Sequence, residues 1–240
     1  MILIRSILFF TFLVISTILL AGIGSILGWI LPRKQIHLFD TTWSRINLWA
    51  LKFFCGLTYR IKGLENIPED NCIIFAKHQS AWETIALVSL IPGPKSWVLK
   101  RELLYVPFFG WIMVHFRPIA IDRKSGRKAV EQIVEQGIER LTSGNHVIVF
   151  PEGTRVAPGT RKRYGIGGAI LAEKSEYPVM PVAHNAGVFW RRRDIRKYPG
   201  VIDVSIGPMI ESAGKNASEI NQIAEVWIEA EVENLPADRV

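Results

Sequence analysis

The sequence predicts an α/β fold: a mixed, largely parallel sheet of about seven strands covered by helices, with an N-terminal membrane-associated helical segment. Short runs rich in Val and Ile alternate with segments of helical period, and Gly, Pro or Asn flank the runs. Such alternation is typical of parallel sheets whose faces are covered by helices. A long apolar stretch at the N-terminus adds the membrane segment.

The N-terminal stretch carries no charged residue from Ser6 to Pro32. As a helix, it would be about 40 Å long, against a hydrocarbon core of about 30 Å. A cleaved signal peptide is one alternative, but its apolar region is usually only about 7–15 residues and precedes a small-residue cleavage site. A buried core helix is the other. We expect a membrane anchor that spans the bilayer with tilt or enters it obliquely.

Charges around this stretch are unequal. Arg5 precedes it, whereas Arg33, Lys34, Arg45 and Lys52 follow it. The positive-inside rule therefore places the rest of the chain in the cytoplasm, on the inner (plasma) membrane of the cell.

A second amphipathic stretch covers about residues 38–57. Its aromatic side chains, among them Trp43, Trp49 and Phe53, are mixed with basic ones. This composition suits the headgroup level of a bilayer, and an ordinary surface helix is the alternative. We therefore divide the chain near residue 58, into membrane-anchoring helices over 1–57 and an α/β domain over 58–240.

The α/β domain begins a regular series of expected elements. We expect strands at 59–62, 72–76, 96–100, 118–121, 146–150, 179–184 and 201–206. Apolar residues fall on one face of helices expected at 127–142 and 217–234. Asn216 and Glu219 have the spacing of a capping box, which would begin the last helix.

The net charge is +7, with basic clusters at 161–163 and 191–197. Beside a membrane anchor, such clusters favour anionic lipid as a partner, since no nucleic-acid recognition motif accompanies them. A solvated basic face is the alternative. Cys55 and Cys72 are too few for a disulfide framework, and no Cys/His cluster points to a metal.

The first candidate site is the segment 77–83, between an expected strand and an apolar helix. A histidine at a strand end lies at the sheet edge where ligands usually bind. His78 and Glu83 would point about 140° apart on a continuous helix, so they meet only if the chain turns at Gln79–Ser80. Glu83 would then accept the Nδ1 proton of His78 and leave Nε2 free as a base.

The same segment has an alternative interpretation as a capping box, with Ser80 as the N-cap and Glu83 three residues later. Glu83 would then only satisfy a backbone N–H. Ser80 itself is not a convincing nucleophile, because the chain has no G-x-S-x-G elbow.

Further candidates follow other expected strands. Arg155 ends the segment F-P-E-G-T-R, where its planar fork could hold a phosphate, although a surface turn with a Glu152–Arg155 pair is the alternative. Arg123 follows the strand expected at 118–121 and could be a second phosphate ligand, with a solvated strand terminus as the alternative. Lys100 precedes an aromatic run, 105–111, that borders an apolar groove or packs in the core.

The order and spacing of these segments resemble the glycerolipid acyltransferase family that includes 1-acyl-sn-glycerol-3-phosphate acyltransferases. Family members carry H-x4-D/E, a block ending near I-x-I-D-R, then F-P-E-G-T-R, then an apolar V-P-V block. The matching segments here are His78–Glu83, Ile119–Arg123, Phe150–Arg155 and Val179–Ala183. The resemblance covers about residues 58–210 and makes 58–240 an acyltransferase domain.

The resemblance implies transfer of a fatty acyl group from acyl-CoA or acyl carrier protein to the sn-2 hydroxyl of 1-acyl-sn-glycerol 3-phosphate (lysophosphatidic acid), giving phosphatidic acid. His78 would be the general base and Glu83 its orienting carboxylate. The substrate-binding residues would be Arg155 and Arg123 on the phosphate, with Lys100, Glu152, Gly153 and Thr154. No metal, other cofactor or acyl-enzyme is required. Backbone N–H groups near the His78 turn or Gly153 are candidates for the oxyanion site.

The chain departs from the family pattern at three positions: Lys77 stands where Asn is commonest, Glu83 where Asp is, and Arg117 where many members have a small residue. The reaction is therefore better defined than the acceptor. The alternatives are glycerol 3-phosphate or another lyso-lipid as acceptor, a thioesterase or lipase, and a non-catalytic, membrane-tethered protein that binds anionic lipid.

Overall fold

The computed structural model describes residues 1–122 and 125–237. Its helices are α1 (Ile2–Leu27), α2 (Arg33–Cys55), α3 (Trp82–Leu90), α4 (Phe109–Met113), α5 (Arg127–Thr142), α6 (Gly167–Ser175), α7 (Ala186–Phe189) and α8 (Ala217–Asn234). Its strands are β1 (Leu57–Lys62), β2 (Ile73–Ala76), β3 (Lys95–Lys100), β4 (Ile119–Ile121), β5 (His146–Val149), β6 (Val179–His184) and β7 (Gly200–Ile206). Single 3-10 turns are η1 (Leu64–Asn66), η2 (Arg101–Tyr105) and η3 (Val114–Phe116).

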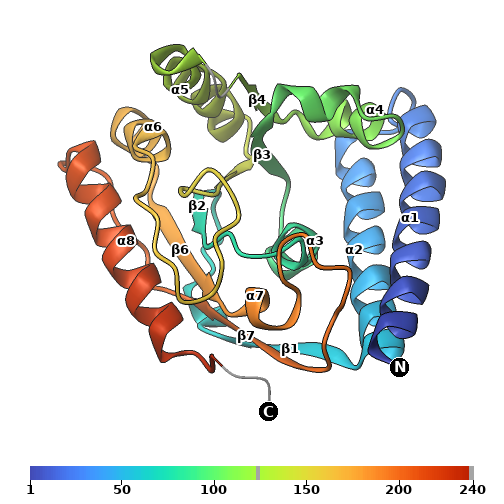
Figure 1. Cartoon of the computed structure of the whole chain (residues 1–240). Helices are drawn as coiled ribbons and strands as arrows, with labels where there is room; N and C mark the ends of the chain where they lie inside the picture. Colours follow the sequence, from blue (N-terminus) through green and yellow to red (C-terminus); the bar gives the residue numbers. More distant parts are fainter. Residues whose placement is uncertain (123–124, 238–240) are drawn as a thin grey trace.

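One seven-stranded sheet crosses the molecule in the order β1-β7-β6-β2-β5-β3-β4 (Figure 1). Neighbouring strands are parallel except β6 and β7, which are antiparallel. Each strand expected from a Val- and Ile-rich run is present, with its ends within two residues of the expected ones. The predicted mixed, largely parallel sheet is therefore confirmed.

The alternation of side chains along the central strand β2 divides the core into two halves. Ile74 and Ala76 face a cluster shared with α2, α3 and α7. Ile73 and Phe75 face the opposite cluster, which is shared with α5, α6 and α8. Helices thus cover both faces of the sheet, which is why the central strands β2, β5 and β6 are buried at every residue.

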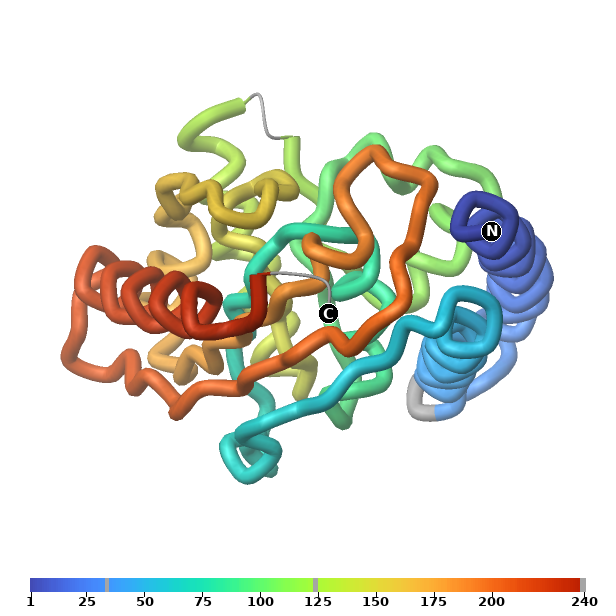
Figure 2. Tube along the Cα trace, turned by 60° about the horizontal axis from the view of Figure 1, so that its bottom comes forward, coloured from blue at the N-terminus to red at the C-terminus, as the bar shows by residue number. Residues whose placement is uncertain are grey.

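Helices α1 and α2 form an antiparallel pair at one side of the α/β domain, as the two views show (Figures 1 and 2). Among the described residues, α1 is the one helix that is long and apolar enough to cross a membrane. Only a narrow stripe of it is buried, at Ser6, Phe9, Ser16, Ala21 and Gly24. The rest of α1 exposes large apolar side chains along its whole length.

The passage from α2 to the sheet is a sharp turn at Gly56, which has a left-handed φ of 66°. Glycine adopts this conformation without the steric cost of a Cβ atom. β1 begins at the next residue and pairs with β7. The division of the chain near residue 58 stays a prediction, since α1 and α2 also pack on the rest of the protein.

Two features of the helices bear on the sequence analysis. The expected capping box is present: Asn216 accepts the N–H of Glu219, and Glu219 accepts the N–H of Asn216. The aromatic segment after β3, in contrast, is neither strand nor long helix. It breaks into η2, α4 and η3, and the buried side chains of α4 and η3 pack against α1 and α2.

Candidate active site

His78 lies at the carboxyl edge of the sheet, two residues after β2 and just before α3. Ligands of α/β proteins usually bind at this edge. The turn at Gln79–Ser80 is present and reverses the direction of the side chains. As a result, Nδ1 of His78 lies 2.9 Å from Oε1 of Glu83.

Glu83 is fully buried and is an acceptor for three donors at once. Besides His78 Nδ1, its Oε1 accepts the backbone N–H groups of Gln79 at 2.9 Å and Ser80 at 2.7 Å. Because Oε1 of Glu83 already accepts two backbone N–H groups, it acts as an acceptor toward His78 too, so Nδ1 of His78 carries the proton and donates. Nε2 is left as the basic nitrogen of the ring.

The surroundings of Glu83 favour its charged form. Burial raises the pKa of its carboxyl, but His184, His78 and the Ser80 N–H outweigh burial, and the pKa lies below its ordinary value. His184 is itself buried, with a lowered pKa caused chiefly by burial. Its Nδ1 accepts the N–H of Ala186, so Nε2 is protonated and donates to the carbonyl oxygen of Lys77 at 2.8 Å.

The capping-box interpretation of the 77–83 segment is met only in part, because the N-cap of α3 is Ala81 rather than Ser80 and makes no side-chain cap bond. Glu83 accepts the Ser80 N–H, as a capping box requires. The reciprocal bond is not made, because Ser80 Oγ accepts the N–H of Trp82 instead. The same carboxylate therefore holds the turn that precedes α3 and orients the imidazole of His78.

The loop after β5 holds the backbone of His78 from both sides. Oε1 of Glu152 accepts the N–H of His78 at 3.1 Å, and the N–H of Val156 donates to the His78 carbonyl at 2.8 Å. Phe150 stacks on the imidazole, with ring centroids 4.0 Å apart and planes at 13°. These contacts leave the ring little freedom to turn.

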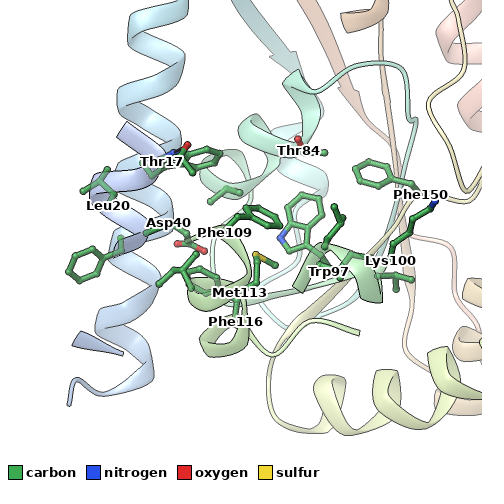
Figure 3. A pocket seen from close by; sticks show the side chains of 18 of the residues that line it. Thr17, Leu20, Asp40, Thr84, Trp97, Lys100, Phe109, Met113, Phe116 and Phe150 are labelled. Carbon is green, nitrogen blue, oxygen red and sulfur yellow. Dashed lines mark hydrogen bonds between the residues drawn. The ribbon is translucent and has the colours of Figure 1, made fainter. Parts of the chain in front are cut away.

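A cavity of about 400 Å³ opens at His78 and extends away from the sheet edge. Arg155, Lys100 and Phe150 line it beside His78. Figure 3 shows Phe150 and Lys100 at one end, Trp97 between, and Thr17 and Leu20 of α1 at the other. Within the aromatic run 105–111, Phe109 lines the cavity, and Phe108 and Phe109 pack partly buried against a hydrophobic cluster, whereas Tyr105 and Trp111 are exposed.

The remaining predicted residues are placed as follows. Glu152 is buried behind His78 rather than in the cavity wall, and burial raises its pKa to about 7. Gly153 and Thr154 form the turn between Glu152 and Arg155. Arg123 lies outside the described residues.

The backbone N–H groups expected at the oxyanion site, and the side chain of Arg117, make contacts within the protein. The backbone N–H groups of Gln79, Ser80 and Gly153 all donate within the protein, so this conformation offers none of them to an oxyanion. The guanidinium of Arg117 contacts Ser143 and Glu139 near the end of α5.

Sequence reasoning missed the structural partners of the site. Phe150 is the first residue of the F-P-E-G-T-R segment, but nothing in the sequence predicted that its ring stacks on His78. His184, the last residue of β6, lies with Nε2 3.9 Å from Oε2 of Glu83. Lys77 is buried beneath the site against Glu229 of α8.

Comparisons with known proteins show which family the chain resembles. The family model described as Acyltransferase matches residues 58–185. A 1-acyl-sn-glycerol-3-phosphate acyltransferase of Pseudomonas aeruginosa is 43% identical over 229 residues, covering 94% of this chain and 89% of the relative. The human 1-acyl-sn-glycerol-3-phosphate acyltransferase alpha is 26% identical over 183 residues, covering 75% of this chain and 65% of that protein.

The fold has a solved counterpart. The crystal structure of the 1-acyl-sn-glycerophosphate acyltransferase of Thermotoga maritima matches with a TM-score of 0.82 at 21% identity, over 100% of this chain and 98% of the other. The match includes the N-terminal helices as well as the sheet. The family model matches more than half of the chain, and the Pseudomonas aeruginosa relative is 43% identical to it. The chain therefore belongs to the Acyltransferase family.

Proposed function

We propose that this protein transfers a fatty acyl group from a thioester, acyl-CoA or acyl carrier protein, to the sn-2 hydroxyl of 1-acyl-sn-glycerol 3-phosphate. The product is phosphatidic acid. One observation carries the proposal: an imidazole oriented by a buried carboxylate opens on a cavity that has Arg155 and Lys100 in its wall and is lined mainly by apolar side chains, with Asp40 and Thr17 at the end near α1 (Figure 3). The names of the relatives that match most of the chain support the choice of acceptor.

In the proposed reaction, Nε2 of His78 removes the proton of the acceptor hydroxyl as its oxygen attacks the thioester carbonyl carbon. The C–O bond forms, the C–S bond breaks, and the electron pair leaves with the thiolate. Glu83 stabilises the imidazolium that forms. General-base assistance of this kind is worth about 10²–10⁴-fold, and correct positioning of the two reactants supplies more.

The acceptor phosphate would bind at the basic end of the cavity, where Arg155 and Lys100 lie. A guanidinium fork can hold a phosphate bidentately, whereas an ammonium acts as a point charge. Arg123 is proposed as a further ligand. Glu152, Gly153 and Thr154 would act by shaping the turn that presents Arg155.

The apolar part of the cavity would hold an acyl chain. Its walls come from α1, α2, α3 and the segment after β3, so the chain would run from His78 toward the exposed apolar face of α1. A substrate with long acyl chains could then enter from the bilayer without passing fully into water, which fits a membrane-bound enzyme.

Contacts along α1 favour a position in one leaflet over a crossing of the bilayer. Ser6 accepts the N–H of Lys197, Thr17 accepts the indole N–H of Trp43, and His115 contacts the carbonyl of Ser25. These polar partners would enter hydrocarbon with a spanning helix, at considerable cost. We propose that α1 and α2 lie in the cytoplasmic leaflet of the inner membrane.

A test of this placement uses Trp49 and Phe53, two exposed and stacked aromatics of α2. Replacing both by Ser should shift the protein from vesicles to solution in a sedimentation assay. Unchanged vesicle binding would remove α2 from the proposed membrane face.

The function itself is tested by an acceptor and donor panel on the purified wild-type protein. We expect radiolabelled acyl groups to appear in phosphatidic acid with lysophosphatidic acid as acceptor, and little product with glycerol 3-phosphate or lysophosphatidylcholine. A preference for another acceptor would replace the proposed substrate. Hydrolysis without transfer would favour a thioesterase.

A further inference from the structure

A buried ammonium group lies directly beneath the candidate active site. Lys77 is 1% exposed, and its Nζ lies 2.5 Å from Oε1 of Glu229 on α8 and 3.5 Å from Oε1 of Glu152. Both carboxylates are buried too. Burying three ionisable side chains together carries a desolvation penalty that lowers the stability of the fold. Packing alone therefore does not explain why they are there.

The group connects segments that are far apart in the sequence. Tyr164 donates to Glu229 Oε1 at 2.9 Å, which adds the segment before α6. Glu152 belongs to the loop after β5, and Lys77 to the loop after β2. One ammonium therefore joins α8 to both loops that form the site.

A single carboxylate oxygen connects this buried group to the candidate base His78. Oε1 of Glu152 faces Lys77 Nζ and also accepts the backbone N–H of His78. Lys77 is the residue immediately before His78, and its own carbonyl accepts the Nε2 proton of His184. The side chain of Lys77 thus helps to fix the next residue's backbone through Glu152.

We propose that Lys77 and Glu229 are positioning residues that, by holding Glu152 against the backbone of His78, aim its imidazole at the acceptor hydroxyl. The proposal rests on the proposed function, in which His78 is the base. Helix α8, which forms no part of the cavity wall, would in this way control the rate of acyl transfer.

Loss of Glu229's charge would leave Lys77 with Glu152 as its remaining carboxylate. The ammonium would then move toward Glu152 and draw its Oε1 away from the His78 N–H. A misplacement of about 1 Å at a reacting group can cost roughly 10²-fold in rate. Because substrate would still bind in the unchanged cavity, the loss should fall on kcat and leave KM near its original value.

The experiment compares three variants in detergent micelles: Glu229→Gln, Lys77→Met, and the double variant. Gln keeps an acceptor for Tyr164, and Met has a length close to that of Lys. Each single change leaves a buried charge unpaired and should lower the thermal unfolding temperature. The double variant should regain much of the lost unfolding temperature.

The activity of the double variant decides between positioning and stability. We expect its kcat to stay at least tenfold below wild type although its unfolding temperature recovers, with KM for lysophosphatidic acid within threefold. Full recovery of kcat along with stability would overturn the proposal and make the pair purely structural. Wild-type kcat in both single variants would overturn it as well.

A matched control lies on the same helix. Glu233 of α8 forms an exposed ion pair with Arg161, so Glu233→Gln breaks an ion pair of α8 without touching Lys77. Its kcat should stay within twofold of wild type, and a tenfold loss there would overturn the assignment to Glu229. Failure of the wild type to transfer acyl groups would instead overturn the proposed function, and this proposal with it.

Discussion

The carboxylate of Glu83 lies 2.9 Å from Nδ1 of His78 while it also accepts the two backbone N–H groups of the intervening turn. The geometry of the base and the start of α3 therefore depend on the same oxygen. A change at Glu83 should disturb both the proton transfer and the local fold, and the size of each effect can be measured separately.

Glu83→Gln keeps the shape of the side chain but removes its charge. An amide cannot stabilise a neighbouring imidazolium, and its NH₂ group can turn toward Nδ1 and favour the wrong tautomer. We expect kcat for acyl transfer to fall by about 10²–10⁴-fold. KM for lysophosphatidic acid should change little, since Glu83 does not line the cavity.

Glu83→Asp is the informative companion, because it keeps the charge but shortens the reach. It should retain more activity than Glu83→Gln. Equal loss in the two variants would assign the effect to the helix start rather than to the charge next to His78.

Arg155→Ala tests recognition of the acceptor phosphate. Hydrogen bonds between charged groups are worth about 1.5–3 kcal/mol, so kcat/KM for lysophosphatidic acid should fall by roughly 10–100-fold. The phosphate-free acceptor 1-acylglycerol should be used at an unchanged rate. A parallel loss with both acceptors, measured in the same micelles, would argue that Arg155 supports the turn instead.

Ala21→Trp tests whether the apolar end of the cavity holds an acyl chain. Ala21 of α1 is buried and lines the cavity, so an indole there would shorten the available space. We expect transfer from long-chain donors to fall at least tenfold while short-chain donors are affected less than threefold. Leu19→Trp, on the exposed face of the same helix, is the control and should keep the wild-type preference.

The elements of the fold were more accessible to sequence reasoning than the contacts within the site. Runs such as 179–184 are mostly apolar because both faces of a central strand are covered by helices, and this is visible in the local sequence. The capping box of Asn216 and Glu219 is likewise a local pattern. The pair His78–Glu83 could be anticipated because it spans a single turn.

The contacts that support the site could not be anticipated in the same way. Lys77 and Glu229 lie 152 residues apart in the chain, and each alone has the appearance of an ordinary surface charge. The aromatic run 105–111 was also ambiguous, since it could border an apolar groove or pack in the core. Tertiary packing against α1 decides between these two roles, and no local sequence pattern predicts that packing.

His146 should make the stability of the protein depend on pH. Burial and the nearby charge of Lys95 lower the pKa of His146 to about 4, from an ordinary value of 6.5. Between these values the unfolded chain binds a proton that the folded protein excludes, so stability is present above pH 6.5 and is lost as the pH falls toward 4. At pH 5 the loss from this residue is about 2 kcal/mol.

His146→Gln should therefore be less sensitive to acid than the wild type. The measurement is the free energy of unfolding by denaturant at pH 7 and pH 5 for both proteins. The pKa values of His184 and Glu152 are shifted too, but both residues are present in the wild type and in the variant. The difference between the two proteins in stability lost on acidification therefore reports on His146. An identical loss on going to pH 5 would show that His146 is protonated in the folded protein.

The central claim is that Nε2 of His78 is the general base for acyl transfer. The most direct measurement is kcat of His78→Ala with lysophosphatidic acid and an acyl thioester, together with the binding of lysophosphatidic acid to the same variant. The account predicts a fall in kcat of at least about 10²-fold with binding unchanged. Acyl transfer at a near wild-type rate by a folded His78→Ala protein would contradict it.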